Sequence, residues 1–76
     1  MTIGQKRVGV NFNPSGEEIV DQIKAKSAEL IDLCESMKTI SNHDAMVNPD
    51  KNRLISIAQT HFETASMFAV KANFAK

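Results

Sequence analysis

Two stretches of this chain carry apolar side chains at alternating steps of three and four residues, and no Gly or Pro interrupts residues 50–76. This spacing places the apolar side chains along one face of a helix, where a second helix can cover them. It therefore predicts an all-α fold in which two amphipathic helices pack together. The first stripe is Val20, Ile23, Ser27, Leu30, Cys34 and Met37; the second is Leu54, Ala58, Phe62, Ala65, Phe68 or Ala69, and Ala72.

Capping residues mark where both helices begin. Ser15 followed by Glu18 fits a capping box, and Asn48 followed by Pro49 suits the start of the second helix, because Pro lacks the N–H that a first helical position leaves unpaired. The first helix is expected to end near Thr39, where the sequence becomes polar. We therefore predict a single domain built as an antiparallel two-helix hairpin, with helices at residues 16–39 and 49–76 and a loop at 40–48.

Residues 1–15 are predicted to form an extended N-terminal arm, because glycines and a proline interrupt them. Phe12 stands in this arm between Asn11 and Asn13, and three explanations for it are open. The ring anchors the arm onto the hairpin, or it reaches a neighbouring subunit, or it is a stacking platform for a planar ligand whose edge meets the asparagines. Periodicity and composition alone favour the anchor.

The chain is too small to be stabilised easily by its own core. A core in a chain of 76 residues seldom supplies more than about 3–5 kcal/mol without disulfides, metals or partners. Cys34 is the only cysteine, so an internal disulfide is excluded, and Cys34, His43 and His61 lack the spacing of a metal site. Both helices also carry more apolar surface than one partner helix covers, which predicts burial in a compact homo-oligomer.

Charge and hydropathy exclude several partners. The nine basic and nine acidic residues cancel, whereas a binder of polymeric nucleic acid would show a basic excess. No apolar run reaches the length of a signal peptide or of a membrane span. Together with the lone cysteine, these features predict a soluble cytosolic protein without a membrane partner.

No catalytic constellation is visible, so the chain is predicted not to be an enzyme and to need no cofactor. Cys34 lies in the apolar stripe, which favours a small buried side chain over a reactive thiolate. Glu17 and Glu18 are neighbours on a helix, so their carboxylates point about 100° apart and do not converge as an acid–base pair. Glu63 interrupts an apolar stretch, and an ion-paired or solvated role suits it better than catalysis. A nucleotide hydrolase stays open as an alternative.

Several cations suggest an anionic ligand instead. Arg53 lies in the first turn of the second helix, where a positive charge opposes the helix dipole, and its planar guanidinium suits phosphate. Ser56 lies on the same face one turn later. Lys24 and Lys26 lie on the first helix, where each is explained by solubility or by contact with an anion.

The second helix resembles a known family. Residues 53–72, RLISIAQTHFETASMFAVKA, resemble the signature of a family of small phage proteins, the anti-CBASS sponges. Members of this family sequester cyclic oligonucleotides and so block a bacterial immune signal. Upstream, Ile23, Lys24 and Ala28 resemble the first helix of the family. The signature positions are Arg53, Ser56, Ala58, Thr60, Phe62, Glu63, Ala65, Met67, Phe68 and Ala69.

The resemblance implies a homo-hexamer of helical hairpins with two kinds of pocket between subunits. One binds cyclic dinucleotides such as cyclic GMP-AMP, with Phe12 stacking on a base, Asn13 beside it, and Lys24 or Lys26 meeting phosphate. The other binds cyclic trinucleotides through Arg53 and Ser56 of three subunits. The implied function is a non-enzymatic sponge acting in the cytoplasm of the infected bacterial host. The alternative is a structural hairpin module for protein–protein assembly.

Overall fold

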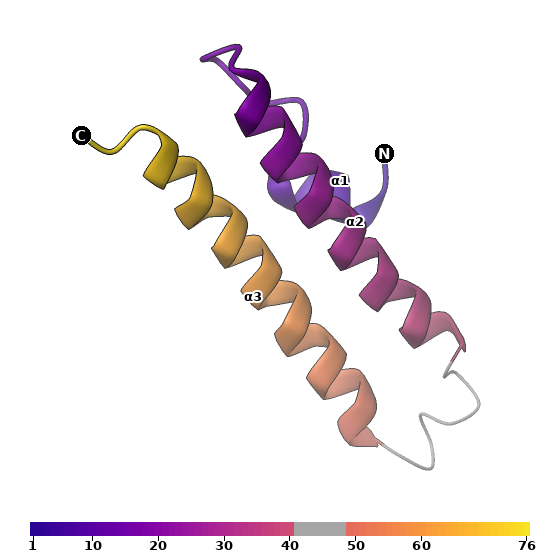
Figure 1. Cartoon of the computed structure of the whole chain (residues 1–76). Helices are drawn as coiled ribbons and strands as arrows, with labels where there is room; N and C mark the ends of the chain where they lie inside the picture. The colour runs from indigo at the N-terminus through magenta and orange to yellow at the C-terminus, as the bar shows by residue number, and fades with distance from the viewer. Residues whose placement is uncertain (41–48) are drawn as a thin grey trace.

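Helices account for most of the part of the chain that the computed structural model describes, residues 1–40 and 49–76. They are α1 (Ile3–Val8), α2 (Glu18–Ile40) and α3 (Pro49–Asn73), and the described residues contain no strand. Figure 1 shows α2 and α3 side by side. Asn73 Nδ2 donates a hydrogen bond to Glu17 Oε2 at 2.5 Å, so the end of α3 lies beside the start of α2.

The prediction of an extended arm at residues 1–15 is wrong for its first half, which forms α1. Thr2 caps this helix, because its hydroxyl accepts from the Gln5 amide and its own amide donates to the Gln5 side chain. Gly9 ends the helix in the left-handed conformation, with φ +66°, that glycine adopts without strain. Gly9, which was expected to interrupt an extended arm, is therefore the C-cap of a short helix.

The prediction that Ser15 and Glu18 form a capping box is also wrong, because α2 begins at Glu18 itself. Gly16, with φ +70°, turns the chain between Ser15 and the helix. The Ser15 hydroxyl accepts a hydrogen bond from the Glu17 amide at 3.2 Å instead. At the other end α2 runs to Ile40, while Asn48, His43 and most of the loop expected at 40–48 lie outside the described residues.

The buried face of each long helix differs from the predicted stripe. Leu30 and Met37 are both 43% exposed and Leu54 is 57% exposed, so three of the residues assigned to the stripes face outward. The long helices are rotated relative to that prediction, so that polar as well as apolar side chains are buried. The apolar core consists of Val20, Ala28, Ile31, Cys34 and Ile55, joined by the buried polar side chains of Lys24, Gln59 and Ser66.

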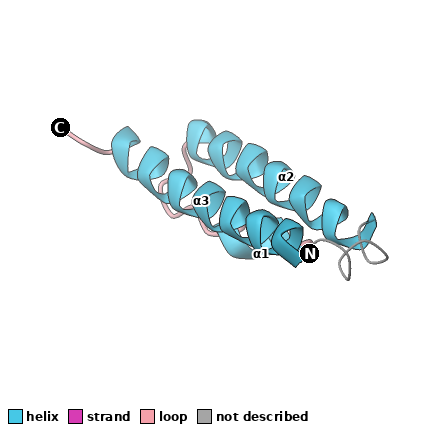
Figure 2. Ribbon diagram, turned by 90° about the horizontal axis from the view of Figure 1, so that it is seen from below, coloured by secondary structure: helices cyan, strands magenta, loops and turns pink. Residues whose placement is uncertain are grey.

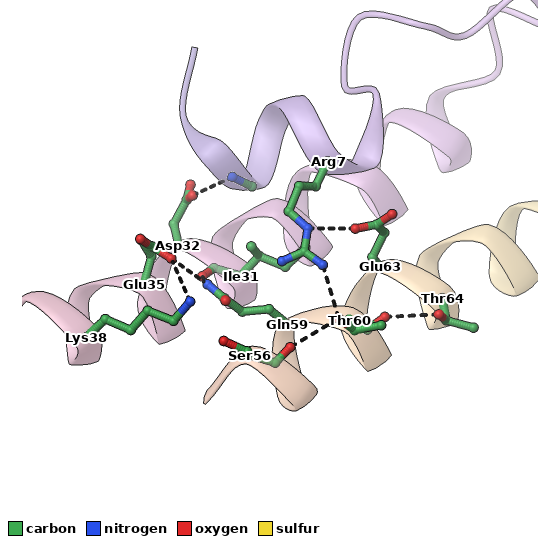
Figure 3. Close-up of polar contacts among 11 residues, drawn as sticks. Arg7, Ile31, Asp32, Glu35, Lys38, Ser56, Gln59, Thr60, Glu63 and Thr64 are labelled. Carbon is green, nitrogen blue, oxygen red and sulfur yellow. Dashed lines mark hydrogen bonds and ion pairs between the residues drawn. The ribbon is translucent and has the colours of Figure 1, made fainter. Parts of the chain in front are cut away.

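Among the described residues, Gln59 is the most deeply buried polar side chain, with 1% of its surface exposed, and it lies between α2 and α3. Its Nε2 donates to the Ile31 carbonyl at 3.1 Å and to Glu35 Oε1 at 2.9 Å (Figure 3). A buried amide without partners destabilises a fold by about 1–3 kcal/mol, so these two bonds favour one alignment of the helices. The spacing of apolar residues in the sequence did not predict that Gln59 is buried.

The rotation of the helices leaves much apolar surface exposed. Among the described helices, each long helix packs only against the other long helix and the short α1, so one protomer cannot enclose all of its apolar side chains. Soluble monomers seldom expose apolar patches of this extent. The exposed large side chains include Ile19, Leu30, Leu33 and Met37 on α2 and Leu54, Ile57, Met67 and Phe68 on α3.

α1 packs against both long helices, as Figure 2 shows from below. The Gly4 amide donates to Asp32 Oδ1 on α2 at 2.8 Å, and Arg7 Nε donates to Glu63 Oε1 on α3 at 2.6 Å. Gly4 is buried at the crossing, where its backbone lies close to the Ala28 carbonyl. α1 therefore fixes the chain that follows it relative to α2 and α3.

Replacing Gly4 by alanine should detach α1. A Cβ at this position would lie 2.2 Å from the Ala28 backbone oxygen and 2.7 Å from Asp32 Oδ1. Overpacking of this kind destabilises a fold by about 1–3 kcal/mol, more than alanine gains in helix propensity. We expect Gly4→Ala to lower the urea midpoint, followed by circular dichroism. Lys6→Ala, at an exposed position of the same helix, is the control and should leave the midpoint nearly unchanged.

Candidate functional site

The loop between α1 and α2 is held in place by its own polar groups. The Phe12 amide donates to the Gly9 carbonyl at 2.9 Å, which makes a tight turn directly after α1. Asn13 Nδ2 donates to the Glu17 carbonyl at 2.9 Å and to Asp21 Oδ1 at 3.0 Å. Asn13 thus fastens the loop to the start of α2, and its amide nitrogen is already occupied within the chain.

Phe12 stands at the rim of a pocket of about 170 Å³ between this loop, α2 and α3. Asn13 and Lys24 line the same pocket, and its opposite wall is formed by Val70 of α3 and by Phe74, which directly follows α3. The Phe12 side chain is 70% exposed, so it is not a core anchor of its own protomer. The explanation that composition favoured is therefore wrong, and contact with a ligand or with another subunit remains.

Lys24 is the buried cation of this pocket, with only 9% of its surface exposed. Its Nζ donates to the Gly9 carbonyl at 3.1 Å and also to the Phe12 carbonyl, and it lies 5.5 Å from the centre of the Phe12 ring. Lys26 is exposed and is not among the residues that line this pocket. Two positions along a helix correspond to a rotation of about 200°, so the two lysines face opposite ways.

A second, more open pocket of about 300 Å³ lies along α3 near its start. Arg53 and Ser56, which the sequence singled out, line it together with Thr60, Ile57 and His61. These residues follow helical spacing, so their side chains share one face of α3. The structure therefore places Arg53 and Ser56 together, beside an imidazole that the sequence did not suggest as part of the site.

Arg53 has an acidic neighbour of its own. Its Nε lies 3.4 Å from Asp50 Oδ1, one turn earlier on α3, and both side chains are more than half exposed. Exposed pairs of this kind contribute little, about 0.2–1 kcal/mol, so the pair offsets the unfavourable position of Arg53 near a helix start without fixing the guanidinium. An anion of higher charge can displace Asp50.

Glu63, the acidic residue within an apolar stretch, pairs with Arg7 of α1 at 2.6 Å, and Arg7 Nη2 also reaches Thr60 Oγ1 at 3.4 Å (Figure 3). The ion-paired interpretation of Glu63 is therefore confirmed. Cys34 is buried, as its place in the apolar stripe predicted. Residues 1–40 and 49–76 contain no cluster of three or more His, Cys, Asp or Glu side chains that could hold a metal.

The sequence missed the part of the Phe12 pocket that comes from a distant segment. Val70 and Phe74 were placed outside the predicted stripe of α3, and only the packing of α3 against α2 brings them to the Phe12 loop. Thr60, Ile57 and His61 could have been found, because they follow Arg53 at helical steps. No helix among the described residues is long and apolar enough to cross a bilayer.

Comparison with known proteins agrees with the resemblance noted in the sequence. Neither the curated proteins nor the solved structures contain a match to this chain. A model of one protein family, the Acb2/Tad1 hairpin domain, matches residues 3–74. Since this match covers almost all of the 76 residues, the chain belongs to the Acb2/Tad1 hairpin family, the anti-CBASS sponges that bind cyclic oligonucleotides.

Proposed function

We propose that this protein is a non-enzymatic sponge that sequesters cyclic dinucleotides such as cyclic GMP-AMP, and cyclic trinucleotides, and so blocks CBASS immunity in the cytoplasm of an infected bacterium. The observation that carries the proposal is the exposed Phe12 ring at the rim of a pocket containing a buried ammonium group. An aromatic face offered to solvent beside a positive charge matches a ligand made of bases and phosphates. Family membership supplies the ligand class.

In the cyclic dinucleotide pocket, Phe12 stacks on a base. The pocket of one protomer is small for a whole cyclic dinucleotide, which supports a site completed by a second subunit. Asn13 holds the loop through its Nδ2 and through its Oδ1, which accepts from the Ser15 hydroxyl at 2.6 Å, and the second lone pair of Oδ1 can accept from a base edge. Lys24 supplies positive charge within the pocket, while Lys26, exposed on the other side of α2, suits a phosphate bound across a subunit contact.

In the cyclic trinucleotide pocket, Arg53 and Ser56 of three subunits surround the ligand. The shared face of α3 that carries both side chains, and the exposure of the guanidinium, support this assignment. Three copies of one arginine match the three phosphates of such a ring, because each guanidinium fork can hold one phosphate through charge-assisted hydrogen bonds.

The test separates the sponge from its alternatives. The protein is mixed with cyclic GMP-AMP, freed of unbound ligand, heated to denature it, and the released material is resolved by chromatography. A sponge returns the intact ring. Linear product would identify a hydrolase, and absence of retained ligand would leave the structural hairpin module as the better interpretation.

We further expect a homo-oligomer, most simply a hexamer of antiparallel hairpins, that persists at micromolar concentration. The reason is the exposed apolar surface on α2 and α3, which a single protomer cannot enclose. Light scattering should give a multiple of the 8.4 kDa chain mass. A single species at the monomer mass would contradict both the assembly and the shared pockets.

A further inference from the structure

We propose that Lys24 is a positioning residue: its ammonium group ties the Phe12 loop to α2, and it acts on the ligand by holding the Phe12 ring in place. This inference rests on the proposed function, since it concerns the same pocket. It assigns to Lys24 a role different from the phosphate contact that the resemblance implies.

The hydrogen bonds of Lys24 are the first argument. An ammonium group has three N–H donors and no acceptor. Two of these donors are directed at the carbonyls of Gly9 and Phe12, which are the first and last residues of the tight turn after α1. The side chain reaches these carbonyls from the second turn of α2, and 9% of its surface is exposed. At most one donor is left for a ligand.

The surroundings of Phe12 are the second argument. Its ring is 70% exposed, so packing within the protomer contributes little to its position. Two hydrogen bonds hold the backbone that carries the ring. The Phe12 N–H donates to the Gly9 carbonyl, and the Lys24 ammonium donates to the Phe12 carbonyl. Without Lys24, one of these two backbone attachments is lost. A mobile ring must be ordered on binding, and that ordering weakens affinity.

The relation between the ammonium and the ring is the third argument. Lys24 Nζ lies over the Phe12 ring at 5.5 Å from its centre, within the range of a cation–π contact. One face of the ring is therefore directed at the cation, and the opposite face is the one a base can cover. Lys24 thus sets both the place of the backbone and the orientation of the ring.

A double-mutant cycle tests this role, because a residue that acts through Phe12 has nothing to act on once the ring is gone. We expect Lys24→Met to weaken cyclic GMP-AMP binding about tenfold in calorimetry, the order expected for loss of a hydrogen bond from a charged group. In a Phe12→Ala background the same change should weaken binding less than about twofold. Lys6→Met, at an exposed site, is the control for lost charge.

A charge-keeping variant separates position from electrostatics. Lys24→Arg retains the positive charge, but a planar guanidinium cannot place one compact group between the two carbonyls. If Lys24 positions the loop, Lys24→Arg should lose affinity as Lys24→Met does. If instead Lys24→Arg binds normally, or if Lys24→Met has the same effect with and without the Phe12 ring, Lys24 meets the ligand directly and the proposal is overturned.

Hydrogen exchange of the ligand-free protein provides a readout that does not depend on binding. Amides of residues 9–13 should exchange faster in Lys24→Met than in the wild type, while amides in the middle of α2 and α3 keep their protection. Unchanged exchange in the loop would overturn the positioning role. Faster loop exchange in a protein that binds no cyclic oligonucleotide would uphold it and reject the proposed function, so the two failures are distinguishable.

Discussion

Substituting Arg53 by alanine is expected to abolish most cyclic trinucleotide binding and to leave cyclic dinucleotide binding nearly intact. In a three-fold site, one substitution removes three guanidinium groups, and a hydrogen bond to a charged group contributes about 1.5–3 kcal/mol. Three such bonds sum to about 4.5 kcal/mol or more, so the loss should be at least about a thousandfold in Kd. Calorimetry with both ligand classes on the same sample measures it.

Asp50→Asn is the matched variant for this experiment. It removes the acidic neighbour at 3.4 Å while keeping the guanidinium, so trinucleotide binding should stay equal or become tighter. Cyclic dinucleotide binding serves as the internal control, because Phe12 lies in the other pocket. An equal loss of both ligand classes in Arg53→Ala would contradict the division into two pockets.

Removing the Phe12 ring should weaken cyclic dinucleotide binding by about 1–3 kcal/mol for each base it contacts, since stacking on an aromatic side chain has this magnitude. Phe12→Tyr keeps the ring face and should bind as well or better. The melting temperature of both variants should stay close to that of the wild type, because the side chain is 70% exposed. Affinity and melting temperature are measured on the same samples.

The outcome also distinguishes a ligand contact from a subunit contact. If Phe12 packs on a neighbouring protomer, Phe12→Ala should lower the mass seen in light scattering as well as the affinity. If it stacks on a base, the assembly should keep its mass. A large fall in melting temperature with unchanged affinity would refute the stacking role.

The sequence predicted the two long helices well, because their signals are local. Helical spacing of apolar residues and a proline at the first position placed α3 within a few residues of its observed ends. The sequence failed for α1, although the signal was present. Thr2, Gln5 and Gly9 carry a capping box and a glycine C-cap around six residues, but so short a helix has little periodicity to recognise.

The rotation of each helix about its axis could not be predicted. The strongest apolar stripe was assumed to face the partner helix within the protomer, whereas Gln59 and Ser66 of α3 are buried there and Leu54 and Phe68 lie outside. When apolar residues surround most of a helix, periodicity does not say which face meets which partner. The same uncertainty hid the contribution of Phe74 to the Phe12 pocket.

The buried amide of Gln59 has a consequence for the distant end of the molecule. Sliding α3 along α2 by one helical turn, about 5.4 Å, would carry this side chain away from the Ile31 carbonyl and Glu35 and leave it without partners. Val70 and Phe74 would move by the same amount and alter the wall opposite Phe12. A residue about three turns from the pocket therefore fixes which residues lie opposite Phe12, and Gln59→Leu should allow this alignment of α3 along α2 to vary.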